Sequence, residues 1–130
     1  LYTQKLLRHI NLQLNDIIIP HILNQLEATG CVELLENSKV NYRTFLHNED
    51  SCAAVIALMN SESALDGTVY NVATDEEISI LDLVALCAEK LGIDNPKIVF
   101  KGYRASDPVR RLLNTEKIRK NLHFLLQKCR

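Results

Sequence analysis

The sequence predicts a small α/β fold with about four helices and short strands between them. Apolar residues recur at the helical spacing of three and four positions in residues 16–29, 49–60, 80–91 and 115–122, and capping residues flank these segments. Short segments rich in β-branched and aromatic residues separate the helices. The chain has 130 residues, of which 47% are hydrophobic and 24% charged, so we expect one globular domain with one core.

The first helix, residues 16–29, is expected to follow a capping residue, Asn15 or Asp16, and to carry Pro20 in its first turn. Gly30 is expected to end this helix in the left-handed conformation. The buried stripe of the helix is predicted to be Ile18, Ile19, Ile22, Leu23 and Leu26. Residues 31–35 alternate weakly and predict a strand, and the polar residues 36–41 predict a loop.

The second helix, residues 49–60, is expected to follow a short strand that Phe45 and Leu46 favour. Asn48 is expected to cap this helix, and Glu49 and Asp50 place negative charge in its first turn, where the helix dipole favours it. One apolar face is predicted at Cys52, Val55, Ile56 and Met59. We interpret the cysteines on helix faces as small buried apolar side chains in a reducing compartment.

The third helix, residues 80–91, is expected to begin at Ser79, with Asp82 in the position of a capping-box acid, and to end at Gly92. Its apolar face is predicted to be Ile80, Leu83, Val84, Cys87 and Leu91. Residues 68–72 contain three β-branched residues and one aromatic residue, so they predict a strand. Residues 6–12 and 98–100 predict two further strands.

Charge and composition exclude several classes of function. The chain carries 15 basic and 16 acidic residues, so its net charge of −1 gives no support to general nucleic-acid binding. No apolar run approaches the ~18 residues of a membrane span, so we expect no membrane partner and a cytoplasmic protein. The cysteines and histidines show neither C-x-x-C nor H-x-x-x-H spacing, so no metal site is expected. Because the chain begins with Leu1 rather than Met, we expect a fragment or a processed chain.

Several segments of the chain resemble one enzyme family. Residues 43–50, R-T-F-L-H-N-E-D, are similar to the R-x-F-(I/V)-H-V-x-D segment of the extended short-chain dehydrogenase/reductases, the NAD-dependent nucleotide-sugar epimerases and dehydratases. Residues 6–12, 67–73, 77–83 and 104–107 resemble further family segments, the last of them R-x-G-D, and all five occur in family order. The chain departs from the family pattern at Asn48, which replaces Val, and at Ala73 and Ser106, which replace Gly.

The resemblance implies that residues 1–130 are the substrate-binding domain of such an enzyme, with residues 1–14 resembling the last part of a missing NAD-binding Rossmann domain. The chain has neither a G-x-x-G-x-x-G fingerprint nor a Tyr-x-x-x-Lys pair. We therefore expect no catalytic residue and no cofactor in this fragment, whereas NAD is implied for the full-length parent. The expected function is nucleotide-sugar binding for an epimerase or 4,6-dehydratase, inactive on its own. The alternative is a non-catalytic α/β binding or interaction module derived from the family.

The same resemblance assigns the nucleotide-sugar diphosphate to Arg43, Arg104, Asp107 and Asn11. Guanidinium groups suit a diphosphate because their planar fork donates two parallel hydrogen bonds, and a carboxylate accepts from ribose or orients an arginine. The alternatives are an Arg43 solvated in a loop, an Arg104 and Asp107 that pair with each other, and an Asn11 that closes a strand. If the diphosphate assignment holds, Arg43 and Arg104 should converge on one cleft.

The resemblance also implies partners for the chain. In the family the substrate-binding lobe packs on the NAD-binding domain, so that domain is the expected partner besides the nucleotide sugar. Without it, residues 6–12 would expose an apolar face and an unpaired strand edge. We therefore expect that the isolated chain can self-associate.

Overall fold

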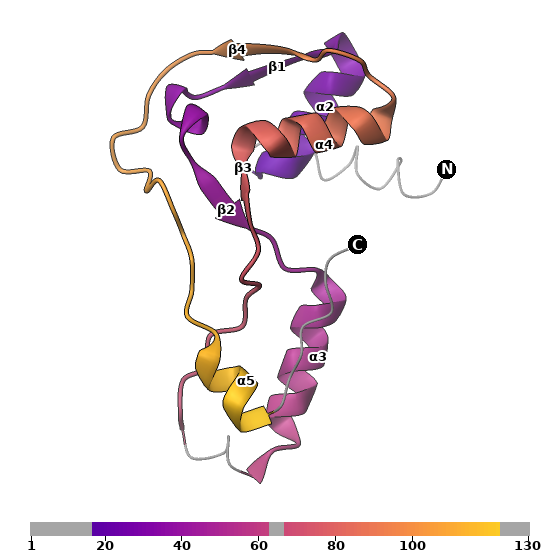
Figure 1. The fold of residues 1–130 in the computed structure, drawn as a ribbon. Coiled ribbons are helices and arrows are strands. Elements are labelled where there is room, and N and C mark those ends of the chain that lie inside the picture. The colour runs from indigo at the N-terminus through magenta and orange to yellow at the C-terminus, as the bar shows by residue number, and fades with distance from the viewer. Residues whose placement is uncertain (1–16, 63–66, 123–130) are drawn as a thin grey trace. The chain divides into compact units, whose positions relative to one another are not determined.

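The computed structural model describes residues 17–62 and 67–122 (Figure 1). In chain order the elements are helix α2 (Ile18–Thr29), strand β1 (Cys31–Leu34), 3₁₀ helix η2 (Glu36–Lys39), β2 (Tyr42–Thr44), α3 (Asn48–Met59), β3 (Glu77–Ser79), α4 (Ile80–Leu91), β4 (Lys97–Phe100) and α5 (Glu116–Leu122). The described residues thus form an α/β fold with four α-helices and short strands, as the sequence predicts.

Contacts between Cα atoms divide the chain into two compact units. The first unit runs up to Asn41 and resumes over Ser79–Asp107, and the second consists of Tyr42–Ile78 and the residues from Pro108 onward. The expectation of one substrate-binding domain over residues 1–130 stays a prediction. The strand expected at residues 6–12 lies outside the described residues. The cap expected at Asn15 or Asp16 is wrong, because the N-cap of α2 is Ile17, whose apolar side chain makes no capping hydrogen bond.

The first unit is built on a parallel pair of strands, β1 and β4, in which Val32 is opposite Ile98 and Leu34 is opposite Phe100. Helix α2 packs against both β1 and α4. The apolar residues buried in this unit are Ile22, Leu26, Val32, Leu34, Ile80, Leu83, Val84, Cys87 and Ala88. All of them except Ala88 come from β1 or from the stripes predicted for the first and third helices. The remaining residues of those predicted stripes are only half-buried: Ile18, Ile19, Leu23 and Leu91. Periodicity therefore identifies most of this core.

Both long helices of the first unit end where the sequence predicts. Gly30 and Gly92 adopt φ angles of 65° and 68°, in the left-handed region that favours glycine, and close α2 and α4. At the start of α4 the Ser79 hydroxyl accepts a hydrogen bond from the Asp82 N–H at 3.0 Å and donates one to Asp82 Oδ2 at 2.6 Å. These local contacts confirm the predicted bounds of the third helix.

The second unit contains the two-stranded sheet of β2 and β3 together with α3 and α5. The short strand expected before the second helix is confirmed as β2, but it covers Tyr42–Thr44, so its expected extension to Phe45 and Leu46 is wrong. The Asn48 cap is also wrong. His47 is the N-cap, because its Nδ1 accepts the hydrogen bond of the Glu49 N–H at 3.2 Å.

Helix α3 buries a different face from the one predicted. Ala54 is fully buried, whereas Val55, Ile56 and Met59 are 50%, 58% and 71% exposed. Cys52 is exposed as well, so the expectation of a buried thiol is wrong there. The residues beside Ala54 on the inward face, Ser51, Ala57 and Leu58, are half-buried, and the predicted face is at the surface.

The strand predicted at residues 68–72 is not formed. Every second residue faces outward, and Val69 is 80% exposed, but no ladder partner lies beside the segment among the residues that the structure describes. Side chains bind it instead: Asn71 Nδ2 donates to Asn114 O at 3.0 Å and Lys117 Nζ to Val69 O at 3.1 Å. High β-propensity therefore does not make a strand here, because a strand needs a neighbour.

Residues 36–41, expected to be a loop, contain η2. The strands predicted at residues 31–35 and 98–100 are confirmed as β1 and β4, with ends shifted by one residue. Over residues 17–62 and 67–122, none of the helices combines the length and the apolar character that crossing a bilayer requires.

Candidate functional site

Arg104 and Asp107, two of the predicted ligand residues, lie at the two ends of a tight turn in the first unit. The Asp107 N–H donates to the Arg104 carbonyl oxygen at 3.2 Å, which closes a β-turn with Ala105 and Ser106 at its exposed tip. Residues at the ends of such a turn have Cα atoms less than about 7 Å apart. The turn therefore presents an exposed guanidinium and a half-buried carboxylate from neighbouring positions.

Two buried asparagines hold this turn. Asn37, 7% exposed, accepts from the Arg104 N–H at 2.9 Å through Oδ1 and donates from Nδ2 to the Arg104 carbonyl oxygen at 3.0 Å. Asn41, 2% exposed, donates from Nδ2 to Asp107 Oδ2 at 2.6 Å. Neither asparagine is among the residues predicted from the sequence, because the polar residues 36–41 predict a loop. Two amide side chains four positions apart beside an apolar segment are the signal that could have indicated them.

The segment that carries these asparagines is itself tied to the rest of the first unit. The Glu36 N–H donates to Gly102 O at 2.9 Å, and the Ile80 N–H at the start of α4 donates to Asn41 O at 3.1 Å. Gly102 has a φ of 79°, in the left-handed region that favours glycine, and a Cβ added there would be in ordinary van der Waals contact with the Leu35 side chain at 3.5 Å. The chain leaving β4 is thereby directed toward the turn.

Arg43 lies on β2 in the second unit. Its Nη1 donates to the carbonyl oxygens of Tyr42 at 2.7 Å, Pro108 at 3.0 Å and Val109 at 3.4 Å. The guanidinium therefore meets the backbone immediately after Asp107 in the sequence, within its own unit. Since Arg104 and Asp107 belong to the first unit, the expected convergence of the two arginines stays a prediction. Asn11 lies outside the described residues.

Arg110, which follows in the second unit, forms an ion pair with Glu77 of β3. Its Nε donates to Glu77 Oε2 at 3.0 Å, and its Nη2 contacts the same oxygen. The hydrogen bond from Arg110 lowers the pKa of the Glu77 carboxyl, and the carboxylate raises the pKa of the Arg110 guanidinium. This pair joins residue 110 to β3, so we interpret Arg110 as structural.

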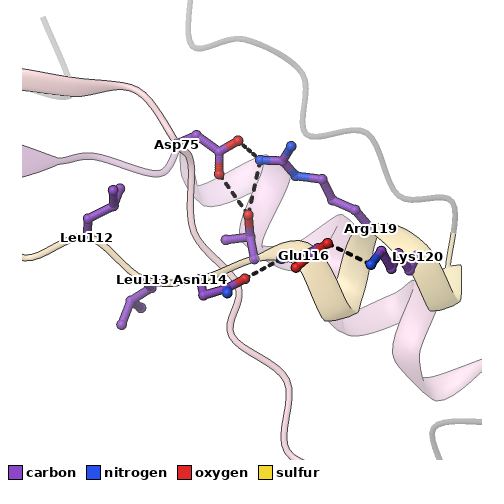
Figure 2. Close-up of a pocket in the computed structure, with 8 residues that line it drawn as sticks. Asp75, Leu112, Leu113, Asn114, Glu116, Arg119 and Lys120 are labelled. Carbon is purple, nitrogen blue, oxygen red and sulfur yellow. Dashed lines mark hydrogen bonds and ion pairs between the residues drawn. The ribbon is translucent and has the colours of Figure 1, made fainter.

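An open pocket of about 600 Å³ lies in the second unit. It is lined by Asp75, Leu112, Leu113, Asn114, Thr115, Glu116, Arg119 and Lys120. Figure 2 shows Asp75 and Arg119 pointing toward one another, and they form an ion pair. The buried Thr115 hydroxyl donates to Asp75 Oδ1 at 2.7 Å and accepts from Arg119 at 3.1 Å, and Lys120 pairs with Glu116 at 2.6 Å. These charged groups bind each other, which indicates a tie between α5 and the loop before β3.

No group of three or more His, Cys, Asp or Glu residues in the described ranges is arranged to hold a metal ion. The turn at residues 104–107 is therefore the candidate ligand site, because it alone among the features described above combines an exposed guanidinium with a carboxylate on a backbone held by buried side chains.

The fold is similar to that of solved nucleotide-sugar enzymes. A dTDP-glucose 4,6-dehydratase from Bacillus anthracis in complex with NAD matches with a TM-score of 0.72 at 21% identity, over 85% of this chain and 34% of its own. The UDP-glucuronic acid 4-epimerase from Bacillus cereus in complex with NAD matches with a TM-score of 0.72 at 17% identity, over 85% of this chain and 34% of its own. MoeE5 in complex with UDP-glucuronic acid and NAD matches with a TM-score of 0.73 at 20% identity, over 88% of this chain and 37% of its own.

These similarities establish the fold: the chain has the α/β architecture of part of these Rossmann-type enzymes. It spans about a third of the length of these structures. No protein-family model and no curated protein sequence matches the chain.

Proposed function

We propose that this chain is the nucleotide-sugar-binding part of an NAD-dependent nucleotide-sugar epimerase or dehydratase. The observation that carries the proposal is the turn at residues 104–107. It presents Arg104 and Asp107, the residues that the family resemblance assigns to the nucleotide, from a single anchored backbone segment. The fold shared with a dTDP-glucose dehydratase and a UDP-glucuronic acid epimerase supports the same function.

In this proposal Arg104 binds the diphosphate and Asp107 accepts from a ribose hydroxyl or orients Arg104. A guanidinium binds phosphate through two parallel charge-assisted hydrogen bonds, which are roughly twice as strong as neutral ones. Arg43 is the second phosphate ligand, and Asn11 donates to a phosphate oxygen.

We further propose that the chain by itself neither binds NAD nor catalyses a reaction. Binding of the NAD pyrophosphate in the Rossmann manner needs a Gly-rich turn that leads into a helix N-terminus. Of the four glycines, Gly30 and Gly92 end helices, and Gly67 and Gly102 lie in loops that no helix follows directly. The residues present therefore do not fit the cofactor, and NAD belongs to the NAD-binding domain of the whole protein. NAD affinity tighter than about 100 μM, roughly 5.5 kcal/mol, would contradict this.

A second candidate function is a non-catalytic interaction module. The exposed apolar face of α3, with Val55, Ile56 and Met59 half or more exposed, favours it, because contiguous apolar side chains at a surface are typical of sites that bind other proteins. The two candidates differ in what they predict for small ligands. The nucleotide-binding function requires affinity for a diphosphate, and the interaction module requires none.

Calorimetric titration with thymidine, uridine and guanosine diphosphates tests the proposal. We expect selective binding of one diphosphate, and Arg104→Ala should weaken it by about 1.5–3 kcal/mol, the range for hydrogen bonds to charged groups. Lys90→Ala is the matched control, since it removes an exposed positive charge from the same unit. No binding at millimolar ligand, or equal loss in both variants, refutes nucleotide binding through the turn.

A further inference from the structure

We propose that Asn37 and Asn41 are positioning residues that hold Arg104 and Asp107 in the geometry needed to bind a nucleotide diphosphate. The inference rests on the proposed function, because it concerns the ligand groups named there. Neither asparagine touches the proposed ligand. Each acts through a group of the turn to which it is hydrogen-bonded.

Asn37 sets the backbone of Arg104. Its side-chain amide has a donor and an acceptor side by side, and both are used, at 3.0 Å and 2.9 Å, by the carbonyl and the N–H of that one residue. A side chain that pairs with both backbone groups of a residue restrains the direction in which its Cα–Cβ bond leaves the chain. Aspartate would keep only the acceptor at this position, and alanine would keep neither group.

Asn41 sets the carboxylate of Asp107. The 2.6 Å hydrogen bond from its amide is charge-assisted and restrains the carboxylate in one orientation. The Asn41 Oδ1 is buried and has no hydrogen-bond partner among residues 17–62 and 67–122. A buried acceptor without a partner is unfavourable for stability, so stability alone is a poor reason for asparagine here. Orientation of Asp107 accounts for this residue type.

Both asparagines come from one short segment, and their partners lie 66 and 67 positions away in the sequence. The segment is fixed in turn by packing of η2 on α4 and by the hydrogen bond from Ile80 to Asn41 O. The turn is therefore ordered before a ligand arrives. We call the hydrogen bonds from Asn37 and Asn41 to the turn the clamp. An ordered site loses less conformational entropy on binding than a mobile one, so loosening the clamp should lower affinity without removing any ligand contact.

The experiment compares Asn37→Ala, Asn37→Asp and Asn41→Ala in the 130-residue chain. The control is Asn71→Ala, which removes an amide that also donates to a backbone carbonyl but lies in the second unit. Amide-proton exchange of Arg104, followed by NMR, reports the clamp. Calorimetry with whichever of thymidine, uridine and guanosine diphosphate the wild-type chain binds most tightly reports the ligand groups, and thermal unfolding identifies any variant that has lost its fold.

We expect Asn37→Ala to speed exchange of the Arg104 N–H at least tenfold and to weaken binding of that diphosphate at least fivefold. Asn37→Asp, which keeps the acceptor, should retain part of the protection. Asn41→Ala should weaken binding at least fivefold and leave the Arg104 exchange rate within threefold, because its partner is the Asp107 side chain. Asn71→Ala should leave both quantities within twofold.

Unchanged Arg104 exchange in a folded Asn37→Ala variant would overturn the clamp. Binding by the Asn37→Ala and Asn41→Ala variants as tight as that of Asn71→Ala would overturn the positioning role. If Asn37→Ala does not fold, Asn37→Asp and Asn41→Ala decide by the same two measurements. If the wild-type chain binds none of the three diphosphates, the proposed function fails and the positioning role fails with it. Arg104 exchange then still shows whether the clamp itself exists.

Discussion

Truncation of Ile56 on α3 should cost little stability, although the periodicity of the sequence places this residue on a buried face. Ile56 is 58% exposed in the structure. Fully burying such a side chain contributes about 1.5–3 kcal/mol, so the two fifths that is covered contributes at most about 1.2 kcal/mol. Alanine also has the higher helix propensity, which returns a few tenths of a kcal/mol. We therefore expect Ile56→Ala to destabilise the chain by no more than about 1 kcal/mol.

Ile118 on α5 is the matched control, because it is an isoleucine on a helix of the same unit and is only 1% exposed. Ile118→Ala removes a fully buried side chain and leaves a cavity, for which about 2–5 kcal/mol is typical. Urea denaturation of both variants, followed by circular dichroism, measures the two free energies. A loss of 2 kcal/mol or more for Ile56→Ala would contradict the exposed α3 face and would indicate that another surface covers it in solution.

Three further predictions each concern a single site: an ion pair, a helix end and two thiols. Glu77 has a pKa below its ordinary value of 4.5 in the folded state, so its contribution to stability is present above pH 4.5 and is lost as the pH falls through the folded pKa. Glu77→Gln should therefore flatten the fall of the melting temperature between pH 6 and 3. An unchanged slope would count against the Arg110 pair. Gly92→Ala should destabilise the chain by about 1 kcal/mol in urea denaturation, because the φ of Gly92 is 68°, a conformation that alanine disfavours. An added Cβ meets no atom within 4 Å, so the cost is conformational alone. A neutral result would show that α4 does not end in the left-handed conformation. Cys52 should react quickly with a thiol reagent and Cys87 slowly, because Cys52 is exposed whereas burial raises the pKa of the Cys87 thiol. Equal rates of reaction with the reagent in the Cys52→Ala and Cys87→Ala variants would contradict this order.

Features that depend on residues close in the sequence were predictable. Helix α4 shows this best: Ser79 caps it, Asp82 completes the first turn and Gly92 ends it, all through contacts within a few residues. The end of α2 at Gly30 has the same origin. The apolar stripes of both helices identify the core of the first unit, because a 3.6-residue repeat places those side chains on one face whatever they pack against.

Features that depend on a distant partner were not predictable. Residues 68–72 have strong β-propensity, yet the sequence contains no information on whether a neighbouring strand lies beside them. Helix α3 has one face with Val55, Ile56 and Met59 and another with Ala54, Ala57 and Leu58, and only packing decides which of the two is turned inward. At its start, Asn48 and His47 are both able to cap, and the backbone geometry selects His47.

The candidate site divides in the same way. Turn residues at positions 104–107 follow from local chemistry, because Ser106, Asp107 and Pro108 favour a turn in any context. Asn37 and Asn41 carry no such local signal, since polar residues in a short segment are typical of an exposed loop. Their burial, and their bonds to a turn more than 60 positions away, arise only when β1 pairs with β4 and brings the two segments together. Hydrogen bonds between distant segments are a property of the folded chain, so tertiary structure alone decided which side chains hold this turn.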